Sequence, residues 1–326
     1  FSLVLGRDLK NLWADWLKAW EEQLAGAPSD AEVEPQYRLK KHRERMVDFI
    51  PHPNGKDWAF VNNDLGKYRL FYQQGEETPQ QIWSKGHAVD TDPDLTYPHL
   101  DWHPNGSLLA MITETEGRVV LMFYDLAKKT WIEKNLFQFE KVMGFCYSLD
   151  GRSFYIAGVR QGQSDIYKYS ILANSIEPLT QDIYDDFDPS PLGNGRILFS
   201  SNRPNAEAHL AHPDSLPDPQ RWSDLFVLEA DEGQWNMQQL TQTPEVHESQ
   251  AAGLEDLNFS YLAQTTRQSL VAWMRLDSAI TYVDTITHYG YYYQEKGRWL
   301  SPLPVERYRP YRSVDQGILV QRLNDG

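Results

Sequence analysis

Carboxylates and imidazoles are the side chains of this sequence best suited to chemistry, and they gather in short segments between apolar runs. Such groups can bind a cation, transfer a proton, or pair with the basic groups of a partner. The candidate set falls in three acidic segments and in a Pro-rich insertion over 203–222, and it comprises Asp90, Asp92, Asp94, Asp182, Asp185, Asp186, Glu245, His247, Glu248, His209 and His212.

The spacing of these residues matches none of the common catalytic motifs. A zinc peptidase needs His-Glu-x-x-His on a helix, but the pair His247-Glu248 is followed by Ser249, Gln250 and Ala251. The Gly-x-Ser-x-Gly elbow of a serine hydrolase does not occur. We therefore predict that this chain is not an enzyme, has no catalytic residues and needs no cofactor.

One metal site stays open as an alternative, and its metal would be calcium. Asp90, Asp92 and Asp94 match the first three acidic positions of a calcium-binding loop. The sixth position is Leu95 where such a loop has glycine, and the twelfth is Asp101 where it has glutamate. The other interpretation of these aspartates is a solvated acidic loop.

Charge and composition limit the kind of partner. The 326 residues carry a formal net charge of −15, which repels a phosphate backbone, so we expect no nucleic acid to bind. A basic protein or a cation suits this surface better. No apolar run approaches the length of a membrane helix, and the single cysteine, Cys146, is expected to be a buried, inert thiol on an inner strand.

A repeated hairpin unit must position the candidate residues. From residue 36 onward, apolar strands alternate with turns, and the turn glycines Gly55, Gly106, Gly151 and Gly195 follow one another at 51, 45 and 44 residues. Each unit has room for four short strands, which is the pattern of a propeller blade. The sequence thus predicts an all-β propeller over 36–326.

We expect six blades of four antiparallel strands. The fifth copy, around Gly253 to Asn258, has lost its turn glycine, and the sixth begins near Tyr311. In such blades, the loops between blades lie on the same face as the loops between second and third strands. The candidate residues fall in or beside these loops, so we predict that they form one partner-binding face around the pore.

Residues 1–35 differ from the rest and are expected to be the tail of an upstream domain. Trp13, Trp16 and Trp20 recur at steps of three and four within 5–25, which predicts an amphipathic helix. A polar stretch with Pro28 follows and is typical of a linker.

The repeats resemble those of the TolB-type, WD40-like propellers of bacterial envelope proteins. The resemblance rests on the Asn-Gly and Asp-Gly turns and on three stretches, Ser200-Ser201-Asn202-Arg203, Pro178-Leu179-Thr180 and Gln239-Leu240-Thr241. The Ser-Pro-Asp-Gly turn of that family is intact nowhere in this sequence. The Trp-rich helix is similar to the last helix of a metallopeptidase-like domain that precedes such propellers in some bacterial surface proteins.

This resemblance implies a non-catalytic scaffold for protein–protein interaction in an outer-membrane-associated assembly, in the periplasm or at the cell surface. Its partners would be other envelope proteins, a membrane barrel or the flanking domains of its own parent. Two alternatives stay open. The propeller could be a substrate-selecting accessory domain of a surface or periplasmic peptidase, or it could bind a cation or small ligand at its pore.

Overall fold

The computed structural model describes residues 44–87, 96–208, 217–231, 234–254, 257–266 and 269–276, four later strands, and residues 11, 13–15 and 18. The chain divides into two compact units, Phe1–His42 and Arg43–Gly326. The described residues of the first unit are helical, as the sequence predicts, and Trp13 is 59% exposed. No helix among the described residues is long and apolar enough to cross a membrane.

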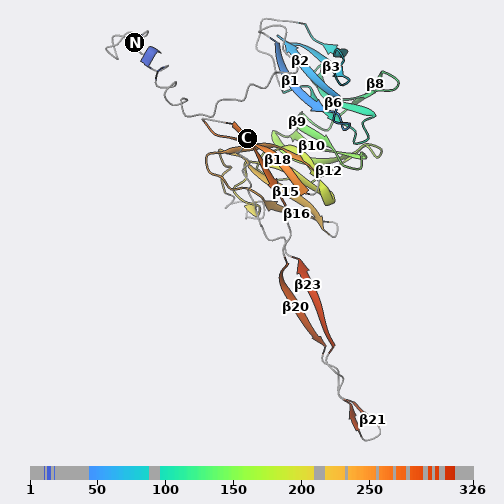
Figure 1. Ribbon diagram of the computed structural model, residues 1–326, viewed down its shortest axis with the longest axis vertical. Helices are drawn as coiled ribbons and strands as arrows, with labels where there is room; N and C mark the ends of the chain where they lie inside the picture. Colours follow the sequence, from blue (N-terminus) through green and yellow to red (C-terminus); the bar gives the residue numbers. More distant parts are fainter. Residues whose placement is uncertain are drawn as a thin grey trace. The chain divides into compact units, whose positions relative to one another are not determined.

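Five antiparallel sheets, the blades, follow one another along the second unit (Figure 1). The first contains β1 (Glu44–Pro51), β2 (Trp58–Asp64), β3 (Lys67–Gln73) and β4 (Gln80–Lys85). The second contains β5 (His99–Trp102), β6 (Leu108–Thr115), β7 (Arg118–Asp125) and β8 (Thr130–Asn135). The third contains β9 (Lys141–Tyr147), β10 (Ser153–Arg160), β11 (Gln163–Ser170) and β12 (Ser175–Pro178).

The fourth blade contains β13 (Asp186–Leu192), β14 (Arg196–Ser201), β15 (Asp224–Asp231) and β16 (Gln234–Gln239), with a 3-10 turn at Gly193–Gly195. The fifth has three strands, β17 (His247–Gly253), β18 (Asn258–Gln264) and β19 (Ser269–Arg275). Strands pair in sequence order within each blade. The repeat pattern therefore predicts the strands of the first four blades correctly.

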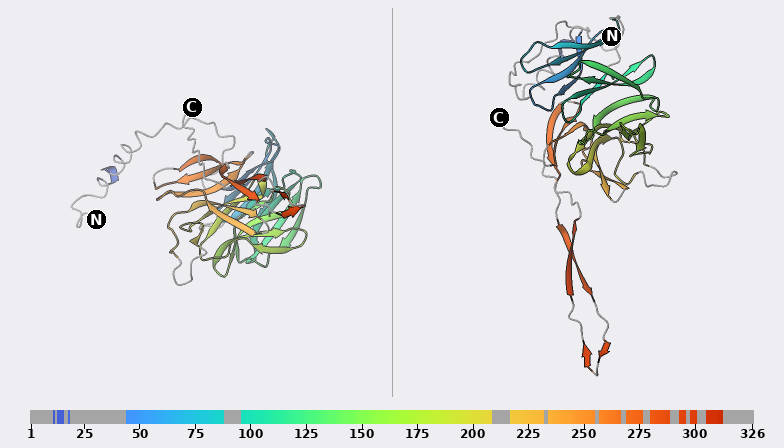
Figure 2. Two further views of the ribbon diagram at one scale, coloured as in Figure 1. Left: turned by 90° about the horizontal axis from the view of Figure 1, so that it is seen from below. Right: turned by 90° about the vertical axis from the view of Figure 1, so that its right-hand side faces the viewer.

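The blades lie side by side in chain order, coloured from blue to orange in Figures 1 and 2. Apolar side chains fill the interface between neighbouring blades, which we call a seam. Four buried clusters correspond to the four seams. Their central members are Trp102 in the first seam, Phe154 in the second, Phe199 in the third and Phe259 in the fourth. Second strands such as β6 are buried on both faces, because each blade packs on two neighbours.

The inner strands β1, β9, β13 and β17 each carry a β-bulge at a matching place. The pairing shifts between Met46 and Asp48 in β1, at Met143 in β9, between Phe187 and Ser190 in β13, and between Ser249 and Ala252 in β17. A bulge bends a strand and redirects the side chains beside it. These bulges turn side chains toward the centre of the blade array.

The expected number of six blades is wrong, because the described part of the chain forms five. The predicted fifth copy folds as a three-stranded blade. Tyr311, near which the sixth copy is expected to begin, lies in β23 (Val305–Arg312), and this strand pairs with β20 (Ile280–His288) as a two-stranded ladder. A second short ladder joins β21 (Tyr293–Glu295) to β22 (Arg298–Leu300). The turn expected at 315–317 lies outside the described residues.

Candidate functional site

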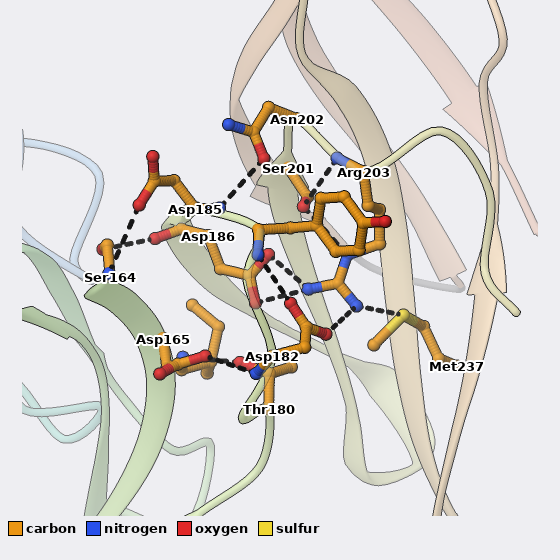
Figure 3. A network of polar contacts seen from close by, with 12 residues as sticks. Ser164, Asp165, Thr180, Asp182, Asp185, Asp186, Ser201, Asn202, Arg203 and Met237 are labelled. Atoms are coloured by element: carbon orange, nitrogen blue, oxygen red, sulfur yellow. Dashed lines mark hydrogen bonds and ion pairs between the residues drawn. The ribbon is translucent and has the colours of Figure 1, made fainter. Parts of the chain in front are cut away.

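A buried arginine organises the third seam, where three of the candidate aspartates lie (Figure 3). The Arg203 side chain is fully buried. Its Nη2 lies 2.6 and 2.7 Å from the two carboxylate oxygens of Asp186, and its Nη1 lies 3.1 Å from Asp182 Oδ2. Its Nε donates to Ser201 Oγ at 2.9 Å. The guanidinium thereby neutralises charge that burial would otherwise make costly.

Aromatic rings complete the surroundings of this guanidinium. The ring centroids of Tyr184, Phe199 and Phe226 lie 5.8, 5.5 and 5.5 Å from Arg203 Cζ. A planar guanidinium suits such surroundings, because it stacks on rings while its edge binds carboxylates. The carboxylates and the rings together thus form a buried binding site for the side chain of Arg203.

Burial raises the pKa of two acids in this seam. Burial raises the pKa of Asp186 to about 6, against the lowering effect of Arg203. Burial, together with the nearby charge of Asp186, raises the pKa of Asp165 to about 7. Asp185 has a different role: it accepts hydrogen bonds from Gln163 Nε2 and the Ser164 amide of the third blade, at 3.2 and 3.4 Å. These two bonds join the third blade to the loop that leads into the fourth.

The second candidate group lies at the fourth seam and is separate from the first. Glu245 and His247 are exposed, whereas Glu248 is only 2% exposed. The His247 ring lies edge-on to Trp222, with centroids 4.9 Å apart. Burial raises the pKa of Glu248 to about 7, while hydrogen bonding from the Thr241 hydroxyl acts in the opposite direction.

The remaining candidate residues, Asp90, Asp92, Asp94, His209 and His212, lie outside the described residues. The described residues hold no group of three or more His, Cys, Asp or Glu side chains that could bind a metal ion. Calcium binding by the three aspartates therefore stays a prediction.

Sequence reasoning missed Arg203 and Asp165 as members of the site. Arg203 ends the Ser-Ser-Asn-Arg stretch and begins the insertion over 203–222. Asp165 belongs to a repeated signal, because Ser164-Asp165 recurs as Ser223-Asp224 at the start of the equivalent third strand. An invariant pair at one end of two blades could have indicated a shared structural role.

A polar cavity of about 580 Å³ opens beside the first group. It is lined by two inter-blade loops and the turn between β10 and β11, and its lining includes Phe137, Glu140, Arg160, Asp165 and Asp182. The Phe137 side chain is 74% exposed. The loops between blades and those between second and third strands, which we call the loop face, thus present an aromatic side chain next to charged groups.

A second cavity, of about 760 Å³, lies at the centre of the array and receives residues from all five inner strands. We call it the channel. The bulges place Asp48, Asp188 and Gln250 in its wall, beside His99 and Gly144. Asp188 Oδ2 accepts the Gln250 amide at 3.1 Å, and burial raises the pKa of Asp188 and brings that of Asp48 to about 6.

Comparisons with known proteins match the fold and leave the function open. No family model matches the sequence, and no curated protein matches it. TolB from Acinetobacter baumannii is 15% identical, with a TM-score of 0.50 over 69% of this chain and 52% of that chain. The putative TolB from Agrobacterium tumefaciens is 21% identical, with a TM-score of 0.44 over 60% of this chain and 64% of that chain.

A protease propeller is also similar to this chain. The propeller domain of the Trilobed protease from Pyrococcus furiosus is 9% identical, with a TM-score of 0.43 over 72% of this chain and 82% of that chain. The chain spans about half the length of the Acinetobacter TolB. The expected TolB-like propeller fold is confirmed.

Proposed function

We propose that this chain is a non-catalytic propeller scaffold that binds other proteins of a bacterial cell-envelope assembly through its loop face. The observation that carries the proposal is the cavity of about 580 Å³ beside exposed Phe137. An exposed aromatic residue next to a polar hollow on a rigid frame is typical of a protein-binding hot spot. The envelope location rests on the TolB-like repeats.

The seams support this role because they make the loop face rigid. Asp182 and Asp186 bind Arg203 across the base of the inter-blade loop, so the carboxylates beside the cavity are held in place before a partner arrives. A preorganised surface loses less conformational entropy on binding. The formal net charge of −15 favours a partner with a basic surface.

Partner capture with matched variants tests the proposal. The chain would be cross-linked in the envelope fraction of its source cells, and partners identified by mass spectrometry. Phe137→Ala should weaken the binding of a specific envelope partner by about tenfold or more, which is the effect of a modest hot spot. Leu172→Ala is the control, because Leu172 is 93% exposed in the turn between β11 and β12, on the opposite face.

If wild type and Phe137→Ala capture the partner equally, the loop face is excluded as the binding surface. A peptidase as the captured partner would support the accessory role instead of an envelope scaffold.

The channel supports a second candidate, the binding of a small organic cation. The wall carries the carboxylates of Asp48 and Asp188 and the Gln250 amide among apolar residues such as Ile50, Met143 and Phe145. This mixture suits an amine with an apolar body better than a bare metal ion. Calorimetric titration with spermidine, repeated on Asp188→Asn, would test it, and equal heats from the two proteins would contradict it.

A further inference from the structure

The inner strands of the fourth and fifth blades repeat each other residue by residue. Asp186 pairs with Ser201 across the fourth blade, and Glu248 pairs with Ala263 across the fifth. A bulge follows one residue later in both strands. Glu248 therefore occupies the place of Asp186.

The contacts across the two seams repeat as well. The Ser164 hydroxyl donates to the Asp186 carbonyl at 2.8 Å, and the Ser223 hydroxyl donates to the Glu248 carbonyl at 3.0 Å. The next residue in each case is a buried aspartate, Asp165 or Asp224. The third and fourth seams are thus built to one plan at this end.

The fourth seam lacks the cation that the plan includes. Arg203 comes two residues after Ser201, and the residue two places after Ala263 is Thr265. The partner of Arg203 is replaced too: the amide of Asp182 donates to Asp165 Oδ1, and in the fourth seam Thr243 makes the equivalent bond to Asp224. Arg203 and Asp182, which form an ion pair in the third seam, are thus replaced in the fourth seam by Thr265 and Thr243.

The exchange leaves a buried carboxylate incompletely bonded. Glu248 is 2% exposed. The Thr241 and Thr243 side chains hydrogen-bond to its carboxylate, but its Oε2 has no hydrogen-bond partner. No residue in the described ranges forms an ion pair with it. A buried carboxylate oxygen without a donor is unfavourable, so this site can gain free energy by accepting one.

We propose that the fourth seam binds a guanidinium group supplied by an arginine side chain of a bound partner protein, in the place that Arg203 fills one seam earlier. The inference rests on the proposed scaffold function and names the chemistry of its partner. Glu248 lies at the loop-face end of β17, directly after exposed His247 and the exposed stretch 242–245, so a partner on the loop face meets this end of the seam.

Argininamide is a probe for this site that needs no identified partner. We expect calorimetry to show saturable binding of argininamide and none of citrulline amide, its uncharged analogue. Glu248→Gln should weaken that binding at least about tenfold, since a charge-assisted bidentate contact is lost. Glu177→Gln should leave it unchanged, because Glu177 is exposed on the edge strand β12.

A second variant decides the matter even if Glu248→Gln fails to fold. Thr265→Arg restores the arginine of the third seam, so it should raise the melting temperature and abolish argininamide binding. The proposal is overturned if wild type does not bind argininamide, or if Thr265→Arg leaves both quantities unchanged.

The same titration identifies the source of the guanidinium. Arg267 of this chain lies close in sequence, and if it filled the site, argininamide would bind only to Arg267→Ala, which would overturn the partner assignment. Failure of the scaffold is a separate result. If an envelope partner binds Glu248→Gln as tightly as wild type, the scaffold function is supported and the guanidinium site is excluded. If argininamide binds but no envelope partner is found, the guanidinium site is supported and the scaffold function is not.

Discussion

At the scale of single residues, Arg203 shows how one side chain can fix an inter-blade loop against the fourth blade. It binds Asp182 and Asp186 and is covered by aromatic rings. Arg203→Met keeps the apolar stem but leaves two carboxylates without their cation, so we expect a loss of about 3–5 kcal/mol in the free energy of unfolding. Urea denaturation would measure it.

Arg160→Met is the matched control for this loss. Arg160 is exposed and stacks on Tyr167, with its Cζ 5.7 Å from the ring centroid. Its replacement should cost no more than about 1 kcal/mol, the usual value of an exposed cation–π contact. Similar losses for the two variants would show that the buried network adds little.

Buried carboxylates should also make the stability of the protein depend on pH. Burial raises the pKa of Asp101, Asp165 and Glu248 to about 7, from ordinary values of 3.8 for aspartate and 4.5 for glutamate. The folded state therefore binds protons more tightly than the unfolded state, so stability falls as pH rises from about 4 to 7. Acids whose pKa is lowered, such as Asp150, titrate below this window.

Calorimetry at constant ionic strength would test the pH dependence. We expect a higher melting temperature at pH 5 than at pH 8, and a smaller difference in Asp101→Asn. A melting temperature that rises from pH 5 to pH 8 would contradict the expectation.

At the scale of elements, two turn glycines serve both conformation and packing. Gly55 and Gly106 have φ of 68° and 74°, a region in which other residues are strained. A Cβ on Gly55 would meet nothing within 4 Å, but one on Gly106 would lie 2.5 Å from His52 Cε1. His52 of the first blade thus packs on the turn of the second and hydrogen-bonds to the Gly106 carbonyl, with 2.9 Å between Nε2 and O.

A double-mutant cycle separates the two effects. Gly55→Ala should cost about 1–2 kcal/mol of unfolding free energy from backbone strain alone, and Gly106→Ala should cost more. In a His52→Ala background the cost of Gly106→Ala should fall to that of Gly55→Ala. Chemical denaturation would give these values, and an unchanged cost in that background would exclude the steric explanation.

The outer strand of the fifth blade, β19, is a candidate site of self-association. In the described part of the chain β19 has no fourth strand beside it, and Leu270, Val271 and Trp273 are 48, 66 and 46% exposed. An apolar open edge favours pairing with another chain. Val271→Lys should reduce concentration-dependent association, as measured by light scattering, while Ile132→Lys on β8 should change it less.

The sequence predicts elements well where local chemistry decides them. Strands and turns of the first four blades follow from alternating apolar residues and glycine spacing. The count of six is wrong because the last copies are weak: the fifth lacks its turn glycine, and Tyr311, near the start of the sixth, lies in a strand that pairs with β20. Which strands pair at the end of an array depends on contacts between distant segments, and a local pattern does not contain these.

At the scale of the whole molecule, the face predicted for binding could be deduced from topology, but its chemistry could not. Alternation and chain order correctly place the loops of Asp182 and Glu245 between blades. The sequence cannot tell that Asp186 and Glu248 are buried while Glu245 is exposed, because each depends on how neighbouring sheets pack. Internal comparison of whole blades, rather than single motifs, supplies that information.

The carboxylate–amide bonds between inner strands run in one direction along the array. Asp48 accepts the Leu100 amide of the next blade, and Asp101 accepts the Tyr147 amide of the one after. In these bonds the acceptor is a particular carboxylate, whereas the donor is a main-chain amide, which every residue type except proline possesses. A blade joined to a new predecessor would therefore keep this bond whatever residue stands at the donor position, provided that it is not proline. Gene recombination could then lengthen or shorten such a protein one blade at a time, wherever the side chains packed in the seam also match, as Gly106 matches His52.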